Sequence, residues 1–168
     1  MGQWSLKERL QPSLLDRLTD LHPEKSKESS SEQSMSQNVF KAAVIRDLGW
    51  LLNSVALDVC VDLDDYPYAK RSVINYGLPD LSGRTSSTID VRSLEKNIKQ
   101  AIHLYEPRVI RSSLEVTVRS NADDMSHNSL VFEINAAVFG QPSPFQVVLR
   151  SELDLESSEV KLTENFDD

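Results

Sequence analysis

Two stretches of the chain repeat apolar residues at intervals of three and four positions, the spacing of an amphipathic helix. The first begins at Asn38, a residue type that caps helix N-termini well, and continues to about Leu57. The second runs from about Asp90 to Tyr105, and Pro107 ends it because the residue before a proline disfavours the helical region. The residues predicted to face inward are Phe40, Val44, Leu48, Leu51, Leu52 and Val55 in the first helix and Val91, Leu94, Ile98, Ala101, Ile102 and Tyr105 in the second.

After Pro107 the period changes to the strict alternation of a half-buried β-strand. Apolar and polar residues alternate over 114–119, 130–138 and 145–154, which predicts three strands. The connectors are polar or carry proline and glycine, so an antiparallel meander is the simplest topology. We therefore expect an α+β fold, a single domain in which the helices pack on one face of a small antiparallel sheet, preceded by an N-terminal helical extension.

The residues before the first long helix divide into two parts. Leucines at helical spacing predict a short amphipathic helix from about Pro12 to Leu21. Residues 22–37 are mainly Pro, Glu, Lys, Ser and Gln, a composition that cannot bury enough apolar surface to become ordered, and they predict a flexible linker. The expected organisation is an N-terminal amphipathic extension (1–21), this linker (22–37), the α+β domain (38–160) and an acidic tail (161–168).

The segment between the two long helices alternates apolar patches with proline and glycine, which predicts turns around one short element. It also contains Asp62, Asp64 and Asp65, which faintly resemble a calcium-binding loop. Because the turn glycine and the closing glutamate of such a loop are missing, a solvated turn is the favoured interpretation.

The composition excludes several classes of function. Among 168 residues, 26 are acidic and 18 basic, and the net charge of -8 excludes a basic nucleic-acid clamp. The single cysteine, Cys60, excludes an internal disulfide, and the lack of a basic and then apolar leader makes a cytoplasmic location the default expectation. No apolar run is long enough to cross a membrane, so we expect membrane association only through a partner.

Motifs for catalysis and cofactor binding are missing from the sequence. It has no phosphate-binding loop, no Gly-x-Ser-x-Gly elbow and no dinucleotide fingerprint. His22, His103 and His127 make no zinc-ligand spacing with the one cysteine. Glycoside hydrolysis needs two acids in contrasting environments, and no such pair stands out among the 26 acids. We therefore predict no cofactor and no metal. Nothing in the residues calls for enzymatic activity, and a glycoside hydrolase stays open as the alternative.

Glu106, Pro107 and Arg108 follow the second long helix, where the helix dipole disfavours a glutamate by about 0.3–1 kcal/mol. Two interpretations are open, and composition alone favours the first. In the first, the proline merely stops the helix while Glu106 lies in water or pairs with Arg108. In the second, the proline fixes a rigid corner from which both charged residues project toward another chain, a role that suits the planar, bidentate group of arginine.

Four phrases follow one another along the chain: LLDRLTD at 14–20, RDLGWLLN at 46–53, SVINYGLPDLSG at 72–83 and YEPR at 105–108. In this order they resemble TssE, the family of baseplate subunits of the bacterial type VI secretion system. That family is similar to a small wedge protein of contractile phage baseplates, and Glu-Pro-Arg is a hallmark of both. Gly49 departs from the family pattern, in which a larger polar residue is expected.

The resemblance implies a structural component of a baseplate wedge, acting with TssF, TssG and TssK, that initiates polymerisation of the contractile TssB/TssC sheath. It implies a cytoplasmic location, docked at the inner face of the cell envelope through the assembled apparatus. In the family the Glu-Pro-Arg motif contacts the helical core bundle of the wedge, so the resemblance makes Glu106, Pro107 and Arg108 partner-binding residues. Two other classes stay under consideration: a muramidase-like peptidoglycan hydrolase, and an adaptor or chaperone unrelated to secretion.

A meander leaves two sheet edges, whose unpaired backbone groups can accept a strand from another chain. The family's fold is similar to the interlocking domain of the sheath, so the resemblance implies that sheath strands pair with one of these edges. The N-terminal helix has two interpretations of equal weight. It packs on its own domain, or it binds a neighbouring subunit at the end of the linker.

Overall fold

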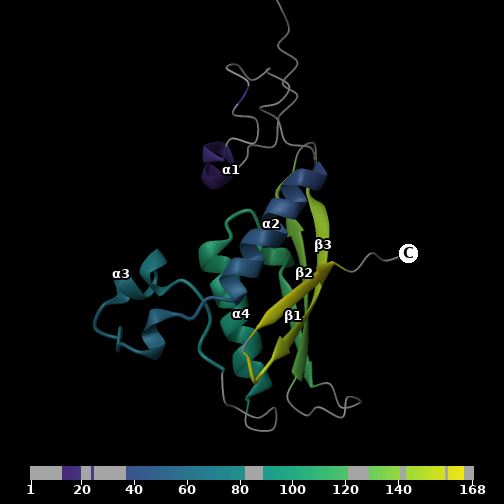
Figure 1. Cartoon of the computed structure of the whole chain (residues 1–168). Coiled ribbons are helices and arrows are strands. Elements are labelled where there is room, and N and C mark those ends of the chain that lie inside the picture. Colours follow the sequence, from purple (N-terminus) through teal and green to yellow (C-terminus); the bar gives the residue numbers. More distant parts are fainter. Residues whose placement is uncertain are drawn as a thin grey trace, which may run out of the picture.

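The computed structural model describes residues 13–19, 24, 37–81, 89–120, 129–140, 143–157 and 159–164. Its centre is a four-stranded sheet in the order β1-β2-β3-β4 (Figure 1). The strands are β1 (Glu115–Ser120), β2 (Ser129–Val138), β3 (Phe145–Asp154) and β4 (Val160–Glu164). Each strand pairs antiparallel with the next along the chain, so the sheet is the predicted meander with one strand added.

The fourth strand corrects the prediction of three strands and of an acidic tail that begins at residue 161. β4 pairs with the second half of β3, with Val160 opposite Leu153 and Glu164 opposite Leu149. Val160 is buried, and the partly buried Leu162 packs against the core. The sheet therefore extends to Glu164 rather than ending before residue 161.

Two long helices cover one face of the sheet, as predicted (Figure 1). α2 (Gln37–Leu52) packs against β4, and α4 (Val91–Tyr105) packs against β1. α2 differs from the prediction at both ends. Asn38 lies inside its first turn rather than at the N-cap, and the helix ends at Leu52 instead of continuing to about Leu57.

The core fills the space between these helices and the sheet. Of the residues predicted to face inward, Val55 is the clear exception, because the helix has ended before it and 57% of the residue is exposed. Along β3 and the middle of β2, buried residues alternate with less buried ones on the opposite face. The largest fully buried apolar side chains are Phe132, Leu51, Ile98, Ile102, Leu130, Ile134, Leu149, Leu155, Val44 and Val138.

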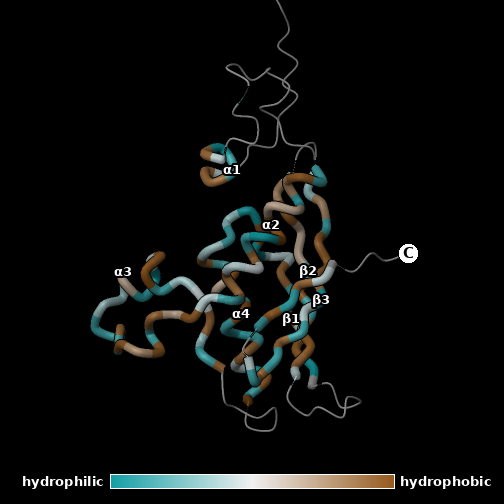
Figure 2. The backbone as a smooth tube through the Cα atoms, in the orientation of Figure 1, coloured by the Kyte–Doolittle hydropathy of each residue, from teal (hydrophilic) through white to brown (hydrophobic). Residues whose placement is uncertain are grey.

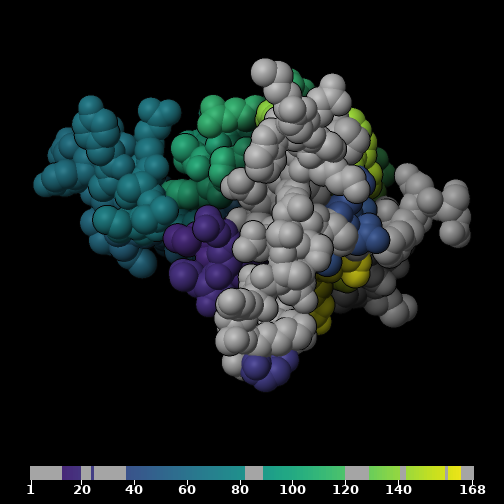
Figure 3. All heavy atoms as spheres, turned by 90° about the horizontal axis from the view of Figure 1, so that it is seen from above, coloured from purple at the N-terminus to yellow at the C-terminus, as the bar shows by residue number. Residues whose placement is uncertain are grey.

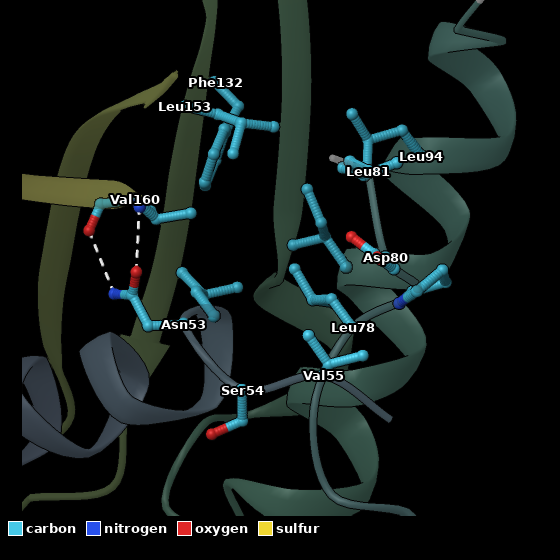
Figure 4. Close-up of a pocket in the computed structure, with 13 residues that line it drawn as sticks. Asn53, Ser54, Val55, Leu78, Asp80, Leu81, Leu94, Phe132, Leu153 and Val160 are labelled. Carbon is cyan, nitrogen blue, oxygen red and sulfur yellow. Dashed lines mark hydrogen bonds between the residues drawn. The ribbon is translucent and has the colours of Figure 1, made fainter. Parts of the chain in front are cut away.

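Asn53 joins the end of α2 to the start of β4 (Figure 4). Its side-chain oxygen accepts from the Val160 N–H at 2.8 Å, and its amide nitrogen donates to the Val160 carbonyl at 3.0 Å. A neighbouring antiparallel strand would make the same two hydrogen bonds, one to the N–H and one to the carbonyl of Val160. The Asn53 amide therefore occupies one position on the free edge of β4.

Between α2 and α4, residues 57–75 form a segment that projects from the body of the molecule, and we call it the arm (Figure 1). One short element was predicted here, and the described residues between α2 and α4 form three. They are the 3-10 helix η1 (Leu57–Val59), the helix α3 (Pro67–Lys70) and the 3-10 helix η2 (Val73–Asn75). A further 3-10 helix, η4 (Arg111–Ser113), leads into β1.

Near the N-terminus, α1 (Leu14–Leu18) is shorter than the predicted helix from Pro12 to Leu21. The Ser13 hydroxyl caps it by accepting from the Asp16 N–H at 3.4 Å. The leucines of α1 are exposed, so this helix does not pack its apolar side on the domain. Apart from Glu24 and Gln37, the predicted linker at 22–37 lies outside the described residues, as do residues 165–168.

Gly49 lies inside α2 and faces Leu162 of β4. A Cβ atom at Gly49 would lie 3.4 Å from the Leu162 Cδ1 atom, which is an ordinary van der Waals contact. Because glycine inside a helix costs about 0.5–1 kcal/mol relative to alanine, we expect Gly49→Ala to raise the free energy of unfolding by about that amount. Urea denaturation measures the change, and a less stable variant would show that α2 and β4 cannot accommodate the methyl group.

Candidate interaction site

Glu106, Pro107 and Arg108 form a corner between α4 and the sheet. As the C-cap of α4, Glu106 donates its N–H to the Ile102 carbonyl at 2.9 Å. On the other side of the proline, the Phe139 N–H donates to the Arg108 carbonyl at 2.8 Å. The corner is therefore bonded to the helix at one end and to the residue after β2 at the other.

The Glu106 carboxylate faces inward, and only 4% of the residue is exposed. Its Oε1 accepts from the Arg108 N–H at 3.1 Å and from Arg108 Nε at 2.6 Å, while Oε2 accepts from Arg108 Nη2. Glu106 and Arg108 therefore pair, as the first sequence interpretation has it, and the buried Glu106 carboxylate does not project from the surface. Contact of the corner with another chain stays a prediction. Pro107 is exposed, and 18% of the Arg108 side chain remains accessible.

Arg108 extends this pair to α2 and, through Arg46, to α1. Arg108 Nη2 donates to Asp47 Oδ2 at 2.6 Å. Arg46 donates to Asp47 Oδ1 from Nε at 2.9 Å and from Nη2 at 2.7 Å, and its Nη1 donates to Asp16 Oδ1 at 2.6 Å. We call these five side chains, Glu106, Arg108, Asp47, Arg46 and Asp16, the ion-pair chain. It connects the end of α4, the middle of α2 and α1.

The neighbours of the two arginines reinforce their charge. Burial works against the charged form of Arg108, but the hydrogen bonds and charges of Glu106 and Asp47 outweigh it and raise the pKa of Arg108. The hydrogen bond to Asp16 contributes most to the raised pKa of Arg46. Both guanidinium groups therefore remain charged at neutral pH. Each also lies over an aromatic ring, Arg108 at 5.8 Å from the Phe40 centroid and Arg46 at 4.9 Å from that of Trp50.

Arg46 and Asp47 were not among the predicted site residues. Their partners Asp16 and Arg108 lie 30 and 61 positions away, so no local pattern joins them. The available signal was the phrase RDLGWLLN, in which two charged residues enter an otherwise apolar stretch of helix. Their placement on α2 makes this helix the centre of the ion-pair chain.

The Asp16–Arg46 pair predicts that the docking of α1 depends on pH. Hydrogen bonding to Arg46 lowers the pKa of Asp16 below its usual 3.8. The pair's contribution is therefore complete above that usual value and is lost as the pH falls through the lowered pKa. We expect NMR shifts of α1 to report detachment in acid, and Asp16→Asn to cause it at neutral pH. Unchanged α1 contacts in that variant would contradict the prediction.

Tyr105, the last residue of α4, holds the base of the arm. Its hydroxyl lies 2.9 Å from the Ser72 carbonyl and 2.8 Å from the Asn75 carbonyl. The buried Asn75 then crosses the arm: its Oδ1 accepts from the Asp58 N–H at 2.9 Å and its Nδ2 donates to the Lys70 carbonyl at 3.1 Å. The phrase SVINYGLPDLSG therefore specifies how the arm closes on α4.

Tyr76 connects this base to the ion-pair chain. Its ring packs edge-on against that of Tyr105, with centroids 5.2 Å apart, and its hydroxyl lies 3.4 Å from the Asp47 carbonyl. Burial raises the pKa of both tyrosines, so both hydroxyls remain protonated donors at neutral pH. The four phrases, far apart in the sequence, thus meet at one place.

A small cavity lies beside Val55, Leu78 and Val160 (Figure 4). Its volume is about 30 Å³, room for about one water, and most of its lining is apolar. Among the described residues, no group of three His, Cys, Asp or Glu side chains is placed to hold a metal ion. No helix in the described part of the chain is long and apolar enough to cross a membrane.

The family model described as baseplate wedge protein gp25 matches residues 38–143, more than half of the chain. The chain belongs to this family. The resemblance to baseplate wedge proteins seen in the sequence is thereby confirmed. Membership supports a structural role in the baseplate of a phage tail or type VI secretion system, among other baseplate and tail proteins, and implies a structural component rather than an enzyme.

Among solved structures, a crystal structure at 1.44 Å from Geobacter sulfurreducens, described as a tail lysozyme, is similar to this chain. The two share 18% sequence identity, and the match covers 75% of this chain and 94% of the other, with a TM-score of 0.42. A likeness this weak carries no argument about function. The comparison with curated proteins found no match.

Proposed function

We propose that this protein is the TssE-type baseplate subunit of a bacterial type VI secretion system. In this role it joins the wedge with TssF, TssG and TssK and initiates polymerisation of the TssB/TssC sheath, in the cytoplasm at the inner face of the cell envelope. The observation that carries the proposal is the meeting of the four TssE-like phrases on the ion-pair chain and the base of the arm. Membership of the wedge protein family supports it.

The corner would supply the contact with the wedge. Pro107 is exposed, and its ring fixes the direction of the backbone. Behind it, the buried Glu106 holds the Arg108 guanidinium in one orientation with 18% of the side chain accessible. We assign Pro107 and Arg108 to the partner contact. Glu106 takes part as the residue that positions Arg108.

The two free edges of the sheet differ in how open they are to a sheath strand. On β1, the Glu95 carboxylate accepts from the outward N–H of Val118 at 2.9 Å, and α4 packs against this strand. On β4, Asn53 occupies only Val160, at the start of the strand. The outward backbone groups over 161–164 lie beyond that contact. We therefore assign strand addition to the edge of β4.

Proline substitutions test this assignment. Outward-facing residues alternate along a strand, so Glu164 has the same orientation as Val160, and Glu164→Pro removes an edge donor while leaving the pairing with β3 in place. We expect cells with this variant and a fluorescent sheath protein to assemble few or no sheaths. Ser120→Pro at the edge of β1 is the matched control and should assemble them normally. Normal assembly with Glu164→Pro, or its loss with Ser120→Pro alone, would overturn the edge assignment.

Two results would overturn the proposed function itself. The first is normal sheath assembly in cells that lack the chain. The second is turnover of purified cell walls by the protein that is lost on changing one acidic residue, because a structural subunit has no use for that chemistry.

A further inference from the structure

The arm, residues 57–75, carries apolar side chains that face solvent. Tyr66, Tyr68, Val73 and Ile74 are 63%, 92%, 79% and 64% exposed. Figure 2 shows hydrophobic segments in the arm, and Figure 3 shows that it projects from one side of the molecule. Single apolar residues scattered over a surface need no explanation, whereas several on one projection make that projection a candidate interaction surface.

The arm is built to hold its shape. Lys70 Nζ bonds Asp64 Oδ1 at 2.6 Å across α3 and the preceding turn. At the base, the Asn75 side chain bonds the backbone of Asp58 and Lys70. The Tyr105 hydroxyl lies within hydrogen-bond distance of the Ser72 and Asn75 carbonyls. The exposed side chains are therefore presented by an internally bonded element. A surface preorganised in this way loses little entropy when it binds.

Charge selects what can bind the arm. The arm holds more acids than bases, and its lysine is engaged with Asp64. The whole chain has a net charge of -8, so a second copy is repelled, as are nucleic acids and anionic membranes. A protein surface with lysine or arginine around an apolar recess is complementary. The charged residues of the arm are Asp58, Asp62, Asp64, Asp65, Lys70 and Arg71.

We infer that the arm is a further docking surface, for a basic and apolar surface of a neighbouring baseplate protein. Tyr68 and Val73 enter the recess, and Asp62 and Asp65 face the basic side chains at its rim. Tyrosine suits such a site, because a large ring with a polar tip is common among the residues that dominate binding energy. The inference rests on the proposed function for the identity of the neighbour, and it uses neither the corner nor the edge of β4.

The test measures the affinity of the full chain for the purified TssF–TssG complex encoded beside it. The double variant Tyr68→Ser with Val73→Ser is expected to bind at least about 30-fold more weakly, with an unchanged melting temperature. Asp62→Asn with Asp65→Asn keeps the side-chain acceptor oxygens and removes two charges, so it should weaken binding and flatten its dependence on salt. Val39→Ser, an exposed apolar residue outside the arm, is the matched control and should bind like the wild type.

The outcomes separate the two proposals. Wild-type chain that does not bind TssF–TssG overturns the proposed function and this inference with it. Wild-type chain that binds, together with a Tyr68→Ser, Val73→Ser variant of equal affinity, overturns the arm alone. A wild-type chain that dimerises in sedimentation experiments, with a monomeric arm variant, would also overturn it, since the arm would then bind a second copy.

Discussion

Replacing Arg108 by alanine is expected to lower the free energy of unfolding by about 3 kcal/mol and the melting temperature by roughly 6–12 °C. The Glu106 carboxylate would stay buried after losing both side-chain donors, and Asp47 would lose its bond to the corner. Removing one member of a buried ion pair typically costs about 3–5 kcal/mol, and the 18% accessibility of Arg108 favours the lower end. Thermal and urea unfolding measure the change.

Two further variants identify the cause. In the Arg108→Ala background, Glu106→Gln should recover part of the lost stability, because it removes the charge left without a partner. Arg111→Ala breaks only an exposed bond to the His103 carbonyl and should change stability by less than about 0.5 kcal/mol. An Arg108→Ala protein as stable as the wild type would show that the ion-pair chain does not hold α4 to α2. Because Arg108 also stabilises the fold, defects of its variants in assembly need to be compared with their stability.

Gly77→Ala is expected to cost about 3 kcal/mol of stability and to loosen the base of the arm. Gly77 has φ = 130°, which side chains other than hydrogen rarely permit. A Cβ there would lie 2.3 Å from the Ser54 carbonyl oxygen and 2.9 Å from the Ala56 nitrogen. These two backbone groups bond Leu78 at 2.8 and 2.9 Å, so a methyl group would break the link that closes the arm.

Hydrogen exchange and urea denaturation together test this effect. The amides of Ala56 and Leu78 should lose protection in Gly77→Ala, along with global stability. Gly49→Ala is the matched comparison and should raise the free energy of unfolding. Its backbone is helical, and its Cβ would meet only a side-chain atom, at 3.4 Å. Equal stability of Gly77→Ala and the wild type would mean that the segment can relax without cost.

The sequence predicts the long elements of this fold because their apolar patterns are long. In α2 and α4 the three- and four-residue spacing of apolar residues repeats over several helical turns, and in the first three strands the alternation of apolar and polar residues repeats several times. β4 has only Val160 and Leu162 as apolar positions within an acidic stretch, too few to distinguish it from a tail. Val55 continues the apolar pattern of α2, yet it lies beyond the end of the helix, where the backbone of Ser54 and Ala56 bonds Leu78 instead. This pairing joins residues more than twenty positions apart, so no local pattern predicts the boundary.

The sequence identifies Glu106, Pro107 and Arg108 as candidate site residues, but it does not predict how their side chains are arranged. The helix dipole argument shows that Glu106 needs compensation, and the residue that supplies it is Arg108. It does not show that the carboxylate is buried, nor that Asp47 shares the same guanidinium group across 61 positions.

Asn53 also bears on what the protein does before it meets its neighbours. An unpaired strand margin can pair with the same margin of another copy, and repeated pairing produces fibres or precipitates. By occupying both backbone groups of Val160, the amide shortens the run of vacant groups on this margin to residues 161–164, which weakens such lateral growth. The part of the margin that remains vacant is the part that we assign to an incoming strand.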